Sequence, residues 1–387
     1  MFESLFVYTL LFLVMYACGK TVARREFRYA AGSGVYEERG RFFSREMWIL
    51  VLAFALIFGC RWGVGRDYFR YLMAYTGMVP ERFEFLFQSL TLALKKTGLH
   101  FCFYFGLWAV LDVVLLYYAL RRYKFLFPFL AFFLIFGSYY LPMMNAIRQY
   151  LAALVFLNAI PYIIQRDLKR FTICLVIAVL LHKLSIILFV IYPILRYKDD
   201  WFRRIWVQLA LYFFAVFISF HSEIIIRWVE MPFEWLSNVL GYHVYHYEAL
   251  FGDKYNRAKF GNNTGLGIWV KMFVTLPVIV FNKPMKRYYN SVHFNMLYTL
   301  YFVGVISSLL FGQSIVLNRV AMFFSIYQLI IQCFFVYFCF HLFPHRIKRR
   351  RQLVFWLGIM VMAVQIPLFL NMVSNPNSTA AFLFFWQ

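Results

Sequence analysis

Charged residues are scarce in this 387-residue chain, at 14% of the sequence, whereas hydrophobic residues make up 63% and aromatic residues 22%. A soluble globular domain is usually about 45–50% apolar. The scarcity of charge therefore excludes a separate soluble domain and predicts a single integral membrane domain over residues 1–387. We expect an all-α polytopic membrane protein.

Sequence motifs for ATP hydrolysis and metal binding are missing too. There is no Walker loop, no Gly-x-Gly-x-x-Gly after a strand, no His-Glu-x-x-His and no Cys-x-x-Cys. Neither an ATP-driven pump nor a zinc protease is therefore supported. The six cysteines lie in or beside apolar segments without paired spacing. This pattern predicts buried thiols, and it indicates neither a disulfide framework nor a metal site.

Acidic residues are also few, with 17 against 39 basic ones, which gives a formal net charge of +22. Such an excess could indicate nucleic-acid binding, but no recognition module is present. The basic residues instead form short clusters between apolar runs, as in the cytoplasmic loops of membrane proteins. We expect the lipid bilayer, and no nucleic acid, as their partner.

Ten apolar segments approach the length of about 20 residues that a membrane span needs. They are 2–19, 47–60, 101–120, 125–141, 148–164, 207–227, 267–282, 292–311, 320–342 and 353–372. The loops richest in lysine and arginine are 20–46, 121–124, 165–170, 196–206, 283–291 and 343–352. The positive-inside rule places these loops in the cytoplasm, which puts both termini outside.

One further apolar stretch, residues 171–195, lies between two basic loops. A single straight span would force one of these loops outside. We therefore predict a re-entrant helical hairpin over 171–195, with His182 and Lys183 at its tip. Irregular backbone at that depth requires burial in protein or a wet cavity. The alternative is a long straight span with His182 and Lys183 in mid-membrane.

Residues 61–100 then form an extracytoplasmic segment that contains several charged side chains. Gly63 and Gly65 predict a break after the preceding helix, and a new helix begins near Asp67. The Asp67 carboxylate could cap that helix or take part in catalysis. Glu84 begins a predicted amphipathic helix in the membrane interface, where it could also be a solvated first-turn acid.

Arginine residues recur at the outer face of the predicted topology. Arg148 and Arg319 lie at the outer starts of two spans. Such arginines can extend to lipid headgroups, but a guanidinium also forms a bidentate fork for phosphate. With Arg61 they predict a shared anion site. Nearby, His182 could accept a proton near neutral pH or be a neutral core histidine.

The predicted extracytoplasmic loop 228–266 alternates aromatic residues with acids and amides. Side chains such as Trp235 and Tyr255 could stack on sugar rings, or they could form an aromatic belt at the membrane interface.

The order of the motifs resembles the EpsG family of Wzy-like polymerases of bacterial exopolysaccharide, capsule and O-antigen. The shared pattern runs from Arg61 through Gly65-x-Asp67-Tyr68, Tyr71 and Glu84 to Arg148-x-x-x-Ala152 and the sequence around His182. It covers about residues 1–340, and the Gly-x-Asp-Tyr and Arg-x-x-x-Ala motifs are its most specific parts. Lys183, beside the histidine, is not a family feature.

The resemblance implies a GT-C-type glycosyltransferase in the bacterial inner membrane, with its active site facing the periplasm or exterior. Donor and acceptor would both be oligosaccharide repeat units linked to undecaprenyl pyrophosphate. A flippase and a chain-length regulator are the further partners we expect, and no cofactor is needed. Two other classes stay open: a membrane O-acyltransferase that modifies glycan, and a flippase or transporter of lipid-linked oligosaccharide.

Transfer from a lipid pyrophosphate requires stabilisation of the leaving group and removal of the acceptor proton. Fixed positive groups usually contribute most to such reactions, and general base assistance adds about 100- to 10,000-fold. For the base we rank Asp67 first, His182 second and Glu84 third. The predicted pyrophosphate-binding residues are Arg61, Arg66, Arg148, Arg319 and Lys183, and the predicted sugar-binding residues are Tyr68, Tyr71, Trp235 and Tyr255.

Overall fold

The computed structural model describes residues 2–30, 42–79, 83–220, 266–312, 315–341, 348–375 and 380–386. Within these ranges the chain is helical apart from its connections and two short strands, β1 (Arg61–Trp62) and β2 (Leu383–Phe384), which pair antiparallel. Two compact units divide the chain. The first comprises Met1–Tyr197 with Gln332–Gln387, and the second comprises Lys198–Ile331.

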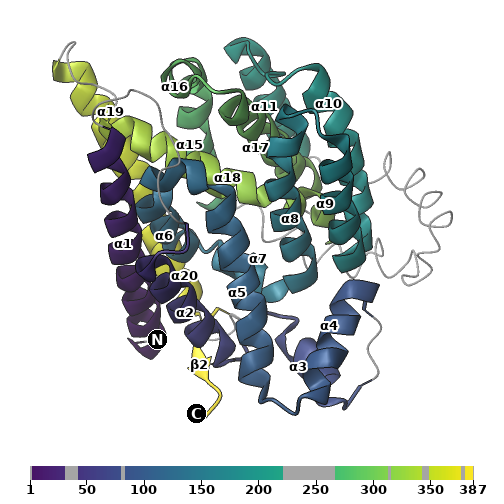
Figure 1. Cartoon of the computed structure of the whole chain (residues 1–387). Helices are drawn as coiled ribbons and strands as arrows, with labels where there is room; N and C mark the ends of the chain where they lie inside the picture. The colour runs from purple at the N-terminus through teal and green to yellow at the C-terminus, as the bar shows by residue number, and fades with distance from the viewer. Residues whose placement is uncertain are drawn as a thin grey trace. The chain divides into compact units, whose positions relative to one another are not determined.

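The first unit is a helical bundle (Figure 1). It contains most of the candidate site residues. Its elements from the N-terminal part of the chain are α1 (Phe2–Ala30), α2 (Arg45–Gly59), β1, α3 (Tyr68–Thr76), α4 (Phe85–Lys96), α5 (Phe101–Ala119), the 3₁₀ helix η1 (Arg121–Leu126), α6 (Phe127–Phe136), α7 (Tyr140–Asn145), α8 (Ile147–Ile164), α9 (Leu168–Leu181), the 3₁₀ helix η2 (Lys183–Val190) and α10 (Ile191–Tyr197). The end of α18 (Ile315–His341), α19 (Lys348–Ala363), α20 (Gln365–Ser374) and β2 complete it.

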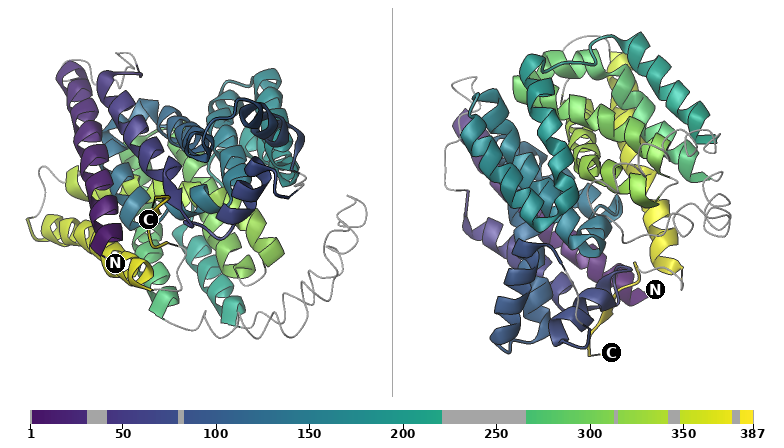
Figure 2. Two further views of the ribbon diagram at one scale, coloured as in Figure 1. Left: turned by 90° about the horizontal axis from the view of Figure 1, so that it is seen from below. Right: turned by 90° about the vertical axis from the view of Figure 1, so that its right-hand side faces the viewer.

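Three helix pairs organise this bundle: α8 with α9, α2 with α5, and α1 with α6. Figure 2 shows the chain from two further sides. Glycine allows the second pair to approach closely, because a Cβ atom on Gly59 would lie 2.7 Å from the carbonyl oxygen of Cys102. The core between the helices is strongly aromatic. Trp108 of α5 stacks on Phe87 of α4 with ring centroids 4.4 Å apart. This contact attaches the short helix α4 to the bundle, and the short helix α3 is attached by Tyr75, which stacks on Tyr104 of α5 with centroids 4.5 Å apart.

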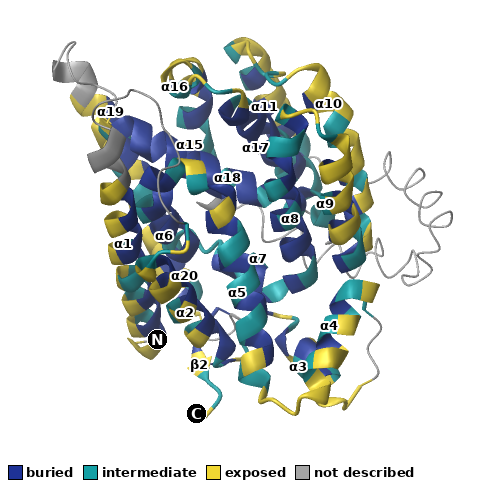
Figure 3. Ribbon diagram, viewed as in Figure 1, coloured by how far each residue is buried: buried dark blue, intermediate teal, exposed yellow. Residues whose placement is uncertain are grey.

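Six of the described helices are long and apolar enough to cross a membrane, and two shorter apolar helices accompany them. Large apolar side chains remain exposed, for example Ile173 and Val176 of α9, which are 51% and 49% exposed. Figure 3 shows exposed positions along α9. Exposed apolar faces of this extent are expected where helices meet lipid. The structure therefore confirms an all-α polytopic membrane protein, while the count of ten spans stays a prediction.

The backbone changes its conformation at the predicted hairpin tip. Helix α9 ends at Leu181, His182 is extended with φ −155° and ψ 111°, and η2 begins at Lys183. The break falls at the polar pair in the middle of the apolar stretch 171–195. Its depth in the membrane stays a prediction. Residues 221–265 lie outside the described residues, and Trp235 and Tyr255 with them.

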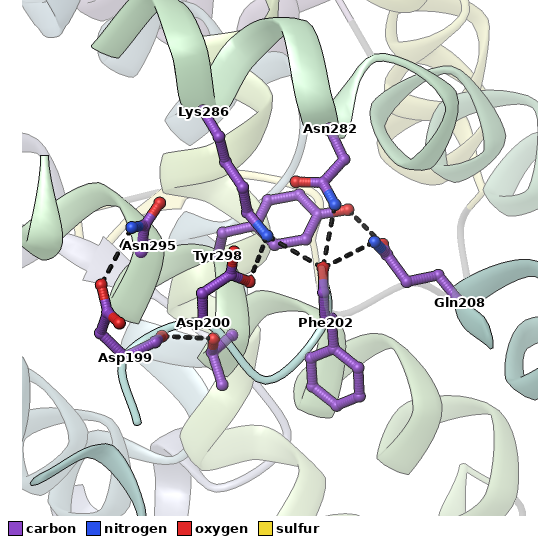
Figure 4. Close-up of polar contacts among 9 residues, drawn as sticks. Asp199, Asp200, Phe202, Gln208, Asn282, Lys286, Asn295 and Tyr298 are labelled. Carbon is purple, nitrogen blue, oxygen red and sulfur yellow. Dashed lines mark hydrogen bonds and ion pairs between the residues drawn. The ribbon is translucent and has the colours of Figure 1, made fainter. Parts of the chain in front are cut away.

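The second unit contains α11 (Ile205–Phe220), α15 (Leu266–Val280), α16 (Asn282–Tyr289), α17 (Val292–Phe311) and the start of α18. Within it, the loop before α11 is attached by a polar network (Figure 4). The carbonyl oxygen of Phe202 accepts hydrogen bonds from Lys286, Asn282 and Gln208, at 2.9, 3.1 and 2.9 Å. Lys286 also pairs with Asp200 at 2.5 Å.

We expect Lys286→Met to destabilise the second unit. The substitution removes the partner of Asp200, whose side chain is only 17% exposed, and breaking a buried ion pair in this way costs about 3 kcal/mol. The matched control is Lys283→Met, because Lys283 is exposed on the same helix. Thermal unfolding of both variants in detergent tests this prediction. If Lys286→Met and Lys283→Met melt at the same temperature, the ion pair of Lys286 with Asp200 contributes nothing to stability.

Candidate functional site

A sharp turn connects the end of α2 with α3. Gly63 and Gly65 have φ values of +70° and +97°, a region that side-chain-bearing residues rarely adopt. A Cβ atom on Gly65 would lie 3.2 Å from the carbonyl oxygen of Met144. The two glycines therefore allow the turn to pack directly on the junction between α7 and α8.

Arg61 holds this turn together from inside. Its side chain is 1% exposed, and it donates to the carbonyl oxygens of Phe58, Val64 and Met144 at 2.5, 3.4 and 3.4 Å. The guanidinium also lies over the ring of Phe105, 4.5 Å from the centroid. Burial lowers the pKa of Arg61 to about 10, so it stays charged at neutral pH. Its role in binding pyrophosphate stays a prediction.

The segment 380–386 fixes the same turn from another part of the chain. Strand β2 pairs with β1, so that Arg61 lies opposite Phe384 and Trp62 opposite Leu383. Helix α1 positions this segment, because the Tyr8 hydroxyl donates to the carbonyl oxygen of Ala380 at 2.9 Å. The start of the candidate site thus depends on residues more than 300 positions away in sequence.

Asp67 immediately precedes α3, as predicted, and its carboxylate makes no capping hydrogen bond to that helix. Its backbone N–H instead donates to Oδ1 of Asn145 at 3.0 Å. Asn145, which ends α7, was not among the predicted site residues. The only sequence signal for it is a polar side chain three positions before Arg148.

Three ionisable side chains from distant parts of the chain meet beside this turn. Glu84, the residue before α4, pairs through Oε2 with Nη1 of Arg148 on α8. The other oxygen, Oε1, lies 3.0 Å from Nδ1 of His182 at the end of α9. The side chains of Glu84, Arg148 and His182 are 10%, 18% and 9% exposed. We call these three residues the charged triad.

The triad keeps Glu84 ionised. Burial by itself favours the protonated acid, but the hydrogen bond with His182 and the charge of Arg148 together lower the pKa of Glu84 to about 2. A carboxylate only accepts hydrogen bonds, so the nitrogen of His182 that faces it, Nδ1, carries the proton. In the neutral imidazole the basic nitrogen is then Nε2.

Aromatic side chains surround the guanidinium of Arg148. It lies over the ring of Phe83, 4.8 Å from the centroid, and 5.9 Å from that of Phe87. The hydroxyl of Tyr71 is another neighbour: burial raises its pKa, and the positive charge of Arg148 opposes that rise. The negative charge of Asp67 also contributes to the raised pKa of Tyr71. Asp67 and the triad therefore belong to one neighbourhood.

The other predicted site residues lie in different surroundings. Lys183 and Arg66 are exposed, and the backbone N–H of Lys183 donates to Glu84 at 3.4 Å. Tyr68 is buried and stacks on Phe105 with centroids 4.7 Å apart. Arg319 belongs to the second unit, so its convergence with the triad stays a prediction. In the described part of the chain, no three His, Cys, Asp or Glu side chains could hold a metal ion.

The fold and the triad define a multi-pass helical membrane protein with a buried, charged polar site. Residues 47–384 match the model of the EpsG family, and the chain belongs to this family of Wzy-like exopolysaccharide polymerase-type proteins. It is thus a polymerase-like membrane protein of polysaccharide biosynthesis. No curated protein and no solved structure matched the chain.

Proposed function

We propose that this protein is a GT-C-type glycosyltransferase that joins oligosaccharide repeat units linked to undecaprenyl pyrophosphate, at the extracytoplasmic membrane face. The observation that carries the proposal is the charged triad, in which Glu84 contacts both Arg148 and His182. Family membership supports the reaction class. The bacterial inner membrane, with the site facing the periplasm or exterior, is the proposed location.

In the proposed reaction, a hydroxyl oxygen of the acceptor repeat unit attacks the anomeric carbon of the donor sugar. The bond from that carbon to the pyrophosphate oxygen breaks, and the lipid pyrophosphate leaves with the bonding electrons. The acceptor proton passes to a protein base. Arg148 would bind the pyrophosphate, since a guanidinium matches two phosphate oxygens at once. Arg66 and Lys183 would add further positive charge.

His182 is the base that this geometry favours. Its Nδ1 is held by a carboxylate that the charge of Arg148 keeps ionised, which leaves Nε2 to accept the acceptor proton. The ionised Glu84 then stabilises the imidazolium that forms, as in other carboxylate–histidine pairs. Asp67, ranked first from sequence, stays the alternative base, because its charge and that of Arg148 both act on the Tyr71 hydroxyl.

Arg61 and Tyr68 would act as positioning residues in this scheme. Arg61 is buried and donates to backbone carbonyls on α2, the glycine turn and α7. Tyr68 covers the same guanidinium, with its ring centroid 5.5 Å from Cζ. Both would set the position of Asp67 and α3. Tyr71 is the better candidate for a sugar contact, since it neighbours Arg148.

A gel of lipid-linked and surface glycans from a strain that lacks this protein tests the proposed function. We expect the ladder of chain lengths to collapse to a single repeat unit, and a plasmid copy to restore it. Loss of all surface repeats would indicate export and overturn the proposal. A ladder of normal length with altered acyl groups would overturn it in favour of the O-acyltransferase.

A further inference from the structure

Two cysteines lie where the end of α2 packs against the start of α5. Cys60 follows the last residue of α2, and Cys102 lies in the first turn of α5. The close approach of Gly59 to the Cys102 carbonyl oxygen brings their backbones together. Cys60 is a neighbour whose side chain interacts with the Cys102 thiol. Both are partly exposed, whereas Cys18, Cys333 and Cys339 are buried.

The two cysteines lie at the two ends of a segment that supplies residues to the candidate site. They flank residues 61–100, the segment that supplies Asp67 and Glu84 to the site. The distribution of lysine and arginine places that segment outside the cytoplasm. Thiols in the periplasm or at the cell surface meet an oxidising environment, in which adjacent pairs are converted to disulfides.

We propose that Cys60 and Cys102 form a disulfide bond that joins the two ends of the segment 61–100. The proposal rests on the extracytoplasmic orientation in the proposed function. The oxidant is the disulfide of an extracytoplasmic thiol oxidoreductase. One thiolate attacks that disulfide and forms a mixed disulfide with the oxidoreductase. The second thiolate then attacks the protein's sulfur in this mixed disulfide and displaces the oxidoreductase as a dithiol, so two electrons and two protons leave the pair.

The bond would act on the site through the segment that it closes. A disulfide stabilises the folded protein mainly because it restricts the unfolded chain. The effect is substantial for a bond that closes a loop of about 40 residues. Arg61 and the glycine turn follow Cys60 directly, and Glu84 lies between the two cysteines. Joining the segment's ends would keep Glu84 within reach of Arg148 and His182 while lipid-linked substrates enter and leave.

The first test measures the redox state in intact cells. Free thiols are blocked with N-ethylmaleimide during acid quenching, the protein is reduced, and a polyethylene glycol maleimide is added. We expect a gel shift by two adducts after reduction and no shift without it. Cys60→Ser and Cys102→Ser should each abolish both adducts, whereas Cys174→Ser should keep them. Absence of the shift in the wild type overturns the proposal.

The orientation is tested separately with Cys102→Ser, which leaves Cys60 without its partner thiol. We expect a membrane-impermeant maleimide to label Cys60 in intact cells, and Cys174→Ser with both site cysteines retained serves as the unlabelled control. Labelling of Cys60 by a permeant reagent alone overturns the orientation and the disulfide together. A normal glycan-ladder result without a reducible pair would leave the polymerase proposal intact and remove only the disulfide.

Stability in detergent provides a third measure. The melting temperature should fall by the same amount in each single variant and in the double variant, because each of them removes the same bond. Dithiothreitol should lower the wild type to that value and leave the double variant unchanged. A wild type that is insensitive to reductant, with variants whose effects add, contradicts a shared bond.

Discussion

Cells that carry Arg148→Ala should display single repeat units at their surface and no long glycan chains. In the structure the guanidinium of Arg148 pairs with Glu84 and lies over Phe83. In the proposed reaction it stabilises the pyrophosphate as negative charge develops. Removal of one such donor costs about 100- to 1,000-fold in rate, and here it also leaves the Glu84 carboxylate without its cation. The measurement is the glycan ladder on a gel.

Two control variants separate catalysis from folding in this experiment. Arg148→Lys keeps a positive charge beside Glu84 but loses the bidentate fork, so we expect a normal amount of protein and a shortened ladder. Lys95→Ala removes an exposed cation from α4, the helix that Glu84 precedes, and should leave the ladder unchanged. Chains of normal length in Arg148→Ala would exclude Arg148 from pyrophosphate binding.

The long helices were predictable because the bilayer imposes a length on them. The apolar runs 101–120, 148–164 and 292–311 correspond to α5, α8 and α17 within one residue at each end. The run 125–141 has no such clear counterpart. There α6 ends at Phe136, and Ser138 takes a φ of +61° before α7 begins. Local backbone geometry of this kind leaves little trace in hydropathy.

The members of the triad were predictable as residue types, since charges beside apolar spans are costly and usually functional. Their pairing was not predictable. Glu84 and Arg148 are 64 positions apart in sequence, and Glu84 and His182 are 98 positions apart. Only the packing of α4, α8 and α9 brings them together. The same holds for Cys60 and Cys102. Their spacing indicates no disulfide, and only the packing of α2 against α5, which Gly59 allows, makes the two residues neighbours.

The pairing of β1 with β2 is a third feature that sequence periodicity could not reveal. Each strand has two residues, which is too short for an alternating pattern. Yet this pairing holds Arg61 at the start of the glycine turn, and Tyr8 of α1 supports it through Ala380. The site therefore depends on parts of the chain that contain none of its ionisable residues.

The substitution Glu84→Gln should reduce the rate of repeat-unit joining by about 100- to 10,000-fold, the range of general base assistance. The amide keeps the shape of the side chain but removes the negative charge that orients Nδ1 of His182 and pairs with Arg148. His182→Ala should have a similar effect, and the double variant should be little worse than either one, because residues that act as a unit give non-additive losses. The assay is the initial rate in proteoliposomes supplied with purified lipid-linked repeat units.

The dependence of that rate on pH distinguishes the two proposed roles. Since the pKa of Glu84 is lowered to about 2, its carboxylate stays ionised above that pH, and protonation of Glu84 cannot shape the profile between about pH 5 and pH 8. A fall in wild-type rate toward acidic pH in that window would therefore come from a group other than Glu84, and its absence in His182→Ala would assign it to His182. Asp67→Asn is the deciding variant. Loss of joining in Asp67→Asn, together with a near-normal rate and an unchanged pH profile in His182→Ala, would transfer the role of base from His182 to Asp67.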